Sequence, residues 1–112
     1  YIKIDIEGLE GQLIENSYFI KNSMPILYIE INDKALNNNG SSSKKLLLLL
    51  KNYGYSFFRN VGYRNLNNDL YLTCFMENLD NFSLSNIFDV LCVRKDSVFF
   101  DYLLKSSIKL KY

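Results

Sequence analysis

The sequence of 112 residues contains no histidine, no tryptophan, one proline and two cysteines. Without histidine, the chain cannot by itself complete a Ser-His-Asp triad, a Cys-His nucleophile pair or a zinc finger with histidine ligands. Cys74 and Cys92 lie in apolar, strand-like contexts, and neither has a partner at CxxC spacing. They therefore predict two buried, reduced thiols rather than a metal or redox site.

An excess of one charge and a long apolar run are also missing. The 13 Lys and Arg residues are interspersed with 12 Asp and Glu residues, for a net charge of +1. This pattern argues against a nucleic-acid partner, which would need a basic surface. The longest apolar run, Leu46 to Leu50, is far shorter than the ~20 residues that span a bilayer, so no membrane span is expected.

The first residues resemble neither a signal peptide nor a natural start. Tyr1-Ile2-Lys3-Ile4 lacks the basic, apolar and small-residue progression of a signal peptide, which favours a cytoplasmic protein. The chain has no initiator Met and opens within a strand-like pattern, so we expect it to be a fragment of a larger domain.

The first third of the sequence predicts a βαβ unit. Apolar and polar residues alternate over Tyr1–Ile6, a period of two that indicates a strand, and Glu7-Gly8 then breaks the pattern. Apolar residues recur at helical spacing from Leu9 to about Lys21, before Pro25. The apolar run Ile26–Ile31 is typical of a buried strand in a parallel sheet.

The middle of the chain predicts a loop, a helix and a strand. The polar stretch Asn32–Ser43 is expected to be a loop whose serines cap the next helix. That helix covers Lys44 to about Tyr53 and is closed by Gly54. Strand character resumes at Tyr55–Phe58.

The last third is less regular. Residues 59–86 show no clear pattern apart from strand composition at Leu70–Phe75. Ile87–Val93 is an apolar strand, and no internal repeat or second domain is visible. Asp96 is placed to cap a final helix with an apolar stripe that includes Val98 and Leu103.

Two of these segments carry a family pattern. Tyr1–Glu10, YIKIDIEGLE, resembles the IKIDVEG-x-E signature of FkbM-type methyltransferases. Met24–Ile31, MPILYIEI, resembles the family's P-x-I-x-x-E-I strand, and Gly54-Tyr55 and Phe88–Val93 follow in the family's order. The likeness covers about residues 1–95, and we expect one partial methyltransferase domain over 1–112 with a helical tail at 96–112.

The resemblance implies an α/β fold, the C-terminal half of a class I (Rossmann-like) methyltransferase sheet with helices on both faces. Tyr1–Ile6 would be the fourth strand and Ile26–Ile31 the fifth. About 55–60 and 87–94 would supply the last two strands, one of them antiparallel. The first two strands and their glycine-rich turn, which approach the cofactor, are not in this chain.

The family transfers a methyl group from S-adenosylmethionine, typically to an oxygen of a sugar or another hydroxylated compound. The resemblance therefore implies S-adenosylmethionine as cofactor and a hydroxylated small molecule or carbohydrate as acceptor. This chain would be the acceptor-side half, and its partner would be the remainder of the domain. The alternative function is a non-catalytic α/β interaction module derived from a truncated methyltransferase.

Three carboxylates are the candidate catalytic residues. Ligands of open α/β sheets bind beyond the carboxyl ends of the strands, where Asp5, Glu7 and Glu30 are expected. Asp5 is the first candidate for the base that accepts the hydroxyl proton or orients the acceptor, and Glu7 and Glu30 would bind acceptor hydroxyls. A divalent cation held by the three is a weaker alternative, so no metal site is assigned.

The resemblance also places Asp5, Ile6 and Gly8 beside the cofactor. Structural roles remain open for the same residues, and Gly8 can simply permit the turn from strand to helix. The corresponding roles for the acids are neutralisation of Lys3 by Asp5, favourable placement of Glu7 and Glu10 in the first helical turn, and pairing of Glu30 with Lys34.

Overall fold

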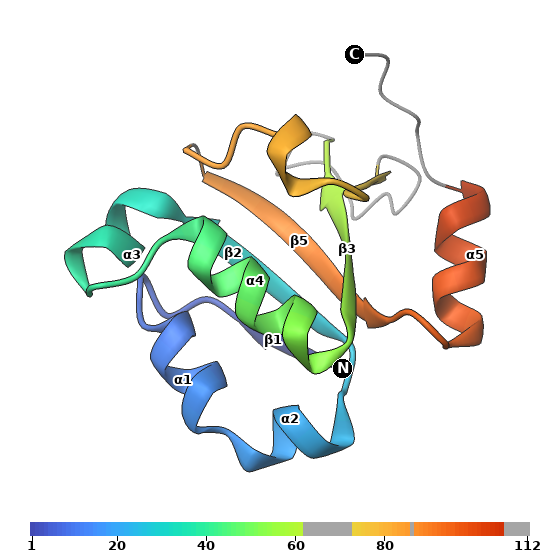
Figure 1. The fold of residues 1–112 in the computed structure, drawn as a ribbon, viewed down its shortest axis with the longest axis horizontal. Helices are drawn as coiled ribbons and strands as arrows, with labels where there is room; N and C mark the ends of the chain where they lie inside the picture. Colours follow the sequence, from blue (N-terminus) through green and yellow to red (C-terminus); the bar gives the residue numbers. More distant parts are fainter. Residues whose placement is uncertain (62–72, 86, 107–112) are drawn as a thin grey trace.

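The computed structural model describes residues 1–61, 73–85 and 87–106 (Figure 1). Strands and helices alternate along the first half of the chain, and strands dominate the second. The elements are β1 (Ile2–Ile4), α1 (Glu10–Asn16), α2 (Tyr18–Ser23), β2 (Leu27–Asn32), α3 (Asp33–Asn38), α4 (Ser43–Tyr53), β3 (Tyr55–Asn60), β4 (Thr73–Phe75), the 3-10 turn η2 (Leu79–Asn81), β5 (Ile87–Arg94) and α5 (Val98–Ser106).

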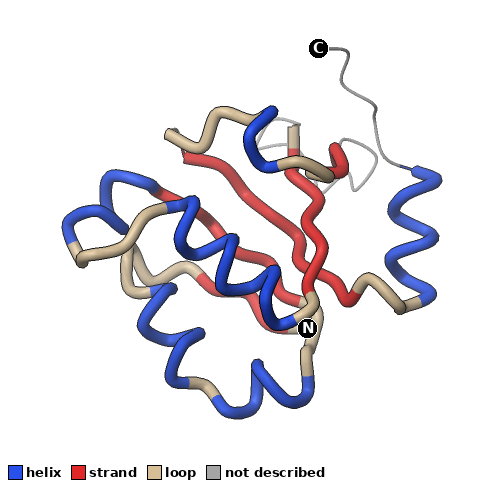
Figure 2. Tube along the Cα trace, viewed as in Figure 1, coloured by secondary structure: helices blue, strands red, loops and turns tan. Residues whose placement is uncertain are grey.

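The five strands form one mixed sheet in the order β1-β2-β5-β3-β4 (Figure 2). Strands β1 and β2 are parallel, which confirms the predicted βαβ unit. Strand β5 is antiparallel to both β2 and β3 and lies between them, so β3 runs in the same direction as β1 and β2. Strand β4 is antiparallel to β3 at the far edge. The α/β class and the antiparallel late strand are as expected.

Helices cover both faces of the sheet. On one face, α1, α2, α3 and α4 bury apolar side chains against β2, among them Ile14, Leu36 and Leu47. On the other face, α5 packs Phe100 and Leu103 on Phe58 and its neighbours. Alternation along β2 reflects this division, since Leu27, Ile29 and Ile31 are fully buried while the residues between them are half-buried.

The strand and helix predicted at the start of the chain are both shorter than expected. Pairing of β1 ends at Ile4 because the backbone turns into left-handed conformations at Glu7 and Gly8, which leaves Ile6 39% exposed. The single helix predicted from Leu9 is divided at Ser17, whose hydroxyl accepts a hydrogen bond from the Ile20 amide at 3.2 Å and begins α2.

The predicted loop at Asn32–Ser43 is partly wrong, because it contains α3. The Asn32 side chain caps this helix by accepting from the Ala35 amide at 3.2 Å. The sequence does not predict this short helix, because three consecutive asparagines, which are poor helix formers, lie at its end. The serine cap was correct: Ser42 accepts from the Lys45 amide at 3.1 Å at the start of α4.

In the later part of the chain, helix α5 is confirmed but its cap is not Asp96. The Ser97 hydroxyl accepts from the Phe100 amide at 3.1 Å, whereas the Asp96 carboxylate is held by Arg94. Both cysteines are free and buried, as predicted. Of the predicted strand at Leu70–Phe75, only Thr73–Phe75 falls within the described residues, and positions 107–112 of the predicted tail lie outside them.

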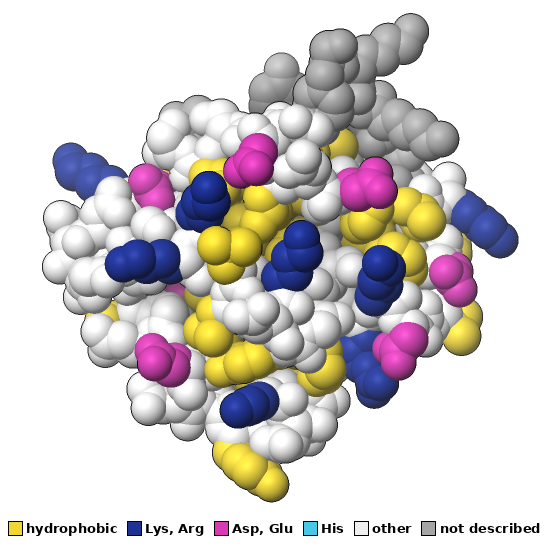
Figure 3. Space-filling model, viewed as in Figure 1, with side chains coloured by type: hydrophobic (Ala, Val, Ile, Leu, Met, Phe, Trp, Pro, Cys, Tyr) yellow, Lys and Arg dark blue, Asp and Glu magenta, His cyan; other side chains and the backbone are white. Residues whose placement is uncertain are grey.

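Acidic and basic side chains are interspersed on the face of the molecule seen in Figure 3. On the surface, Lys44 is paired with Asp80 at 3.5 Å and Arg94 with Asp96 at 3.0 Å. No helix within the described ranges combines the length and the apolar character required to cross a bilayer.

Candidate functional site

A row of polar residues crosses the sheet where the three parallel strands β1, β2 and β3 end. Glu30 on β2 lies directly opposite Asp89 on β5, and Asn60 on β3 lies opposite Thr73 on β4. The pairing of β3 with β5 ends at Arg59 and Val90, and the same register places Asn60 level with Asp89. Paired residues of neighbouring strands point to the same face, so these four side chains share one face of the sheet.

Asp5 extends this row just beyond the end of β1. Ile4 is the last paired residue of β1 and faces Ile29, so Asp5 is one position further, level with Glu30. We call Asp5, Glu30, Asp89, Asn60 and Thr73 the polar row. Four of its members lie on β2, β3, β4 and β5, and Asp5 directly follows β1, so their common position is set by strand register rather than by sequence proximity.

A tyrosine connects the polar row to the apolar part of the same face. The Asn60 side-chain amide donates to the Tyr28 hydroxyl at 3.3 Å. Burial raises the pKa of Tyr28, Asn60 opposes this rise, and the charge and hydrogen bond of Asp89 add to it. Tyr28 is therefore a neutral hydroxyl between Asn60 and Asp89, and Asp89 is itself only 8% exposed.

The loop from Asp5 to Gly8 presents the other predicted site residues. Asp5, Ile6 and Glu7 are exposed, and Glu7 has a left-handed backbone with φ of 50°. A buried carboxylate holds the loop from beneath: Glu10 is 1% exposed and accepts from the Gly8 amide at 2.8 Å and from the Ile6 amide at 3.3 Å. Glu10 therefore does more than favour the start of α1, because it fixes the backbone of the loop.

Gly8 lies against α3. Its φ is +98°, and a Cβ atom at this position would be 2.4 Å from the Ala35 carbonyl oxygen and 2.7 Å from the Asn39 side-chain amide. The expected turn role is confirmed, since only glycine combines this backbone conformation with such a close approach. Helix α3 directly follows β2, so the contact also joins the loop after β1 to the end of β2.

The structure brings Asp5 and Glu30 together in the polar row, while Glu7 lies two residues further along, in the turn. In the described part of the chain, the side chain of Asp5 makes no hydrogen bond or ion pair, so its predicted pairing with Lys3 is not formed there. Nor do the described residues contain a group of three Asp, Glu or Cys side chains arranged to hold a metal ion.

Sequence reasoning did not select Asp89, Asn60, Thr73 or Tyr28. Asp89 could have been selected, because it is the one charged residue in the apolar run Ile87–Val93. No sequence feature singles out Asn60, since the chain contains many asparagines. Both join the site only because β5 inserts between β2 and β3.

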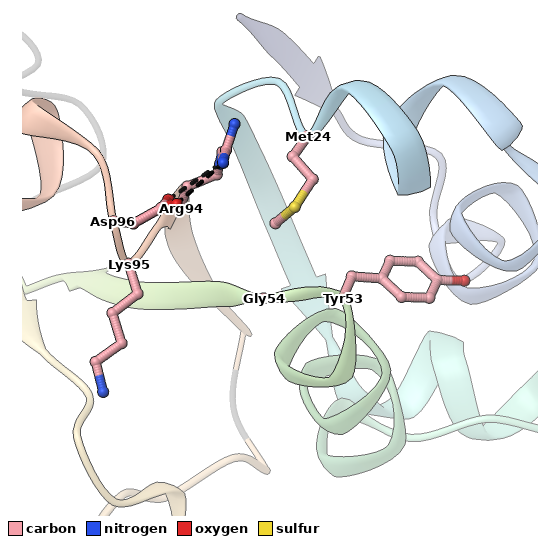
Figure 4. A pocket seen from close by; sticks show the side chains of 6 residues that line it. All are labelled: Met24, Tyr53, Gly54, Arg94, Lys95 and Asp96. Atoms are coloured by element: carbon pink, nitrogen blue, oxygen red, sulfur yellow. Dashed lines mark hydrogen bonds and ion pairs between the residues drawn. The ribbon is translucent and has the colours of Figure 1, made fainter.

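Two hollows lie at the opposite end of the sheet from the polar row. One, of about 410 Å³, is lined by Met24, Tyr53, Gly54, Arg94, Lys95 and Asp96 (Figure 4). Met24 points toward Gly54, and the Arg94 guanidinium is engaged with Asp96 through two hydrogen bonds of 3.0 and 3.1 Å. The other, of about 550 Å³, lies beside the start of β3 and includes Phe57 and Phe100. Neither hollow contains Asp5, Glu7 or Glu30.

The chain was compared with protein-family models, curated proteins and solved structures. The family model described as the methyltransferase FkbM domain matches residues 1–57. This segment runs from β1 into the first half of β3, and it includes Asp5, Gly8, Glu10 and Glu30. No curated protein and no solved structure matched the chain.

Proposed function

The chain belongs to the FkbM methyltransferase domain family, and from this premise we propose that it is the acceptor-side half of an S-adenosylmethionine-dependent O-methyltransferase. The observation that carries the proposal is the polar row, which collects carboxylates from β2, from β5 and from the residue that follows β1, where the parallel strands end. Open α/β sheets bind ligands beyond this end of their strands.

The sheet supports the class I (Rossmann-like) assignment. Three strands run in one direction and one antiparallel strand is inserted before the last of them, in line with the antiparallel late strand that the family resemblance implies. On this assignment β1 is the fourth strand of the whole sheet and β2 the fifth. Strand β1 is the edge of the sheet, where the remainder of the domain would pair with it.

The residues present fit part of the cofactor's surroundings. Asp5 and Ile6 are exposed on a loop of fixed backbone, so they can contact a ligand at the end of β1. Gly8 is buried, with its amide bonded to Glu10 and its Cα against α3, so it would contribute through the shape of the turn. When bound, S-adenosylmethionine supplies the methyl group and leaves as S-adenosylhomocysteine.

The three carboxylates Asp5, Glu7 and Glu30 would bind and deprotonate the acceptor. Asp5 accepts the proton of the acceptor hydroxyl while the oxygen of that hydroxyl receives the methyl group. The proton ends on the Asp5 carboxylate, and the product is a methyl ether. A positioned base of this kind contributes about 10²–10⁴-fold. Glu30 beside it and Glu7 on the loop accept hydrogen bonds from other hydroxyls of the acceptor, which suits a sugar or another polyhydroxylated small molecule.

Calorimetry and a methyl-transfer assay test the proposal on the protein extended upstream in its own reading frame. We expect S-adenosylmethionine to bind, and Asp5→Asn to lower kcat by about 10²–10⁴-fold while cofactor binding is retained. Asp101→Asn, an exposed acid on α5, is the matched control and should be unaffected.

Absence of cofactor binding by the folded, extended protein would contradict the proposal. It would instead favour the non-catalytic interaction module, in which the family relationship reflects ancestry alone. Cofactor binding and methyl transfer with full activity in Asp5→Asn would retain the enzyme but remove Asp5 from the chemistry.

A further inference from the structure

We propose that Glu10 is the positioning residue of the site, and that its buried carboxylate holds the Asp5–Gly8 loop in the conformation that methyl transfer requires. This inference rests on the proposed function. Glu10 contacts the backbone of Ile6 and Gly8, so it acts through the loop and not on the acceptor itself.

The chemistry of the contact requires a carboxylate. Oε1 of Glu10 accepts from the Ile6 amide at 3.3 Å, and Oε2 accepts from the Gly8 amide at 2.8 Å. Both oxygens are therefore occupied by backbone donors that flank the left-handed residue Glu7. A glutamine of the same shape has one acceptor and one donor, so one of the two amides would face an N–H group instead of an oxygen.

The conformation of the loop depends strongly on this contact because the contact is buried. Glu10 is 1% exposed, so water cannot replace a lost hydrogen bond at this position. The left-handed backbone of Glu7 is unfavourable for a residue with a side chain and persists only where its surroundings hold it. Glu10 supplies that support from the α1 side, and the contact of Gly8 with Ala35 supplies it from the α3 side.

The two supports also set the relative positions of the proposed catalytic carboxylates. Asp5 is the residue before Ile6, and Glu30 lies on the strand that leads directly into α3. With the loop fixed to α1 and α3 together, Asp5 is held level with Glu30. Loss of the Glu10 contact would release Asp5 while leaving Glu30 on its strand.

The test compares Glu10→Gln, Glu10→Asp and Glu15→Gln in the extended protein. Glu15 is an exposed glutamate of the same helix and controls for the loss of one charge on α1. We expect Glu10→Gln to lower kcat by about 10- to 100-fold with the KM for S-adenosylmethionine nearly unchanged, because a small misplacement of a reacting group has an effect of this size. Glu10→Asp, which keeps both acceptor oxygens on a shorter stem, should restore part of the rate.

Amide hydrogen exchange gives a second readout that does not need activity. The amides of Ile6 and Gly8 should lose protection in Glu10→Gln and keep it in Glu15→Gln, while the amides of β2 stay protected in both. Loss of protection throughout the molecule would show a general stabilising role and overturn the positioning role. Unchanged kcat in a folded Glu10→Gln would overturn it as well. If the wild-type protein transfers no methyl group, the proposed function fails, and the exchange of Ile6 and Gly8 still decides whether Glu10 holds the loop.

Discussion

Replacement of Gly8 by alanine tests the packing of the loop against α3. The φ of +98° lies in a region that disfavours any residue with a Cβ, at a cost of about 1–2 kcal/mol. The added methyl would also lie 2.4 Å from the carbonyl oxygen and 2.6 Å from the carbonyl carbon of Ala35. These are backbone atoms of a helix and cannot move aside cheaply, and overpacking of this kind costs about 1–3 kcal/mol. We therefore expect Gly8→Ala to lower the free energy of unfolding by about 2–5 kcal/mol.

Gly40→Ala is the matched control. Gly40 also has a positive φ, of +78°, but an added Cβ there would meet no atom within 4 Å. It should therefore show the backbone cost alone, about 1–2 kcal/mol. Urea denaturation followed by circular dichroism measures both variants against the wild type. Equal losses in Gly8→Ala and Gly40→Ala would refute the argument that contact with α3 determines the glycine at position 8.

Two further predictions concern the sheet and its connections. The Ser43 amide donates to Asp33 at 2.8 Å and lowers the pKa of that carboxyl, so the ionised form stabilises the fold at neutral pH and the benefit is lost as the pH falls below about 4. Asp33→Asn should therefore destabilise the protein in urea at pH 7 and make little difference near pH 2; an equal effect at both would contradict this. Phe58 is fully buried, with ring centroids 5.1 Å from Phe75 and 5.7 Å from Phe100, so Phe58→Ala should cost about 3–5 kcal/mol in the same assay. Phe19→Ala, at a position 58% exposed, should cost far less, and similar losses in the two variants would contradict a core built around Phe58 on the α5 face of the sheet.

Local patterns identified most of the elements. Alternation at the start of the chain, the apolar run before Glu30 and the Gly54 stop each depend on a few neighbouring residues, and each is present in the structure. The predictions were wrong where a side-chain cap overrode apolar periodicity or helix propensity. The Ser17 hydroxyl starts a new helix inside an apolar stripe, and Asn32 caps a helix in a stretch of poor helix formers.

Two of the five residues of the polar row, Asp5 and Glu30, were already candidate site residues in the sequence. Asp5 and Glu30 were selected because each is an acid at the end of a strand-like run, and the predicted βαβ unit makes β1 and β2 neighbours in the sheet. Asp89 and Asn60 were not, because they are 59 and 30 residues from Glu30 in the chain and meet it only through the antiparallel insertion of β5.

The sequence by itself determined the βαβ unit, the glycine turn after β1, the family pattern and the acids that end two strands. These features depend on side-chain periodicity and on the conformational preferences of single residues, which are local properties. The tertiary structure alone decided the strand order, the composition of the polar row and the role of Glu10. Strand register places five distant residues in one row, and burial turns a glutamate that could have been an ordinary first-turn acid into the acceptor that holds the loop. Both outcomes follow from the requirement that buried polar groups and apolar faces each find partners, which only the assembled sheet can satisfy.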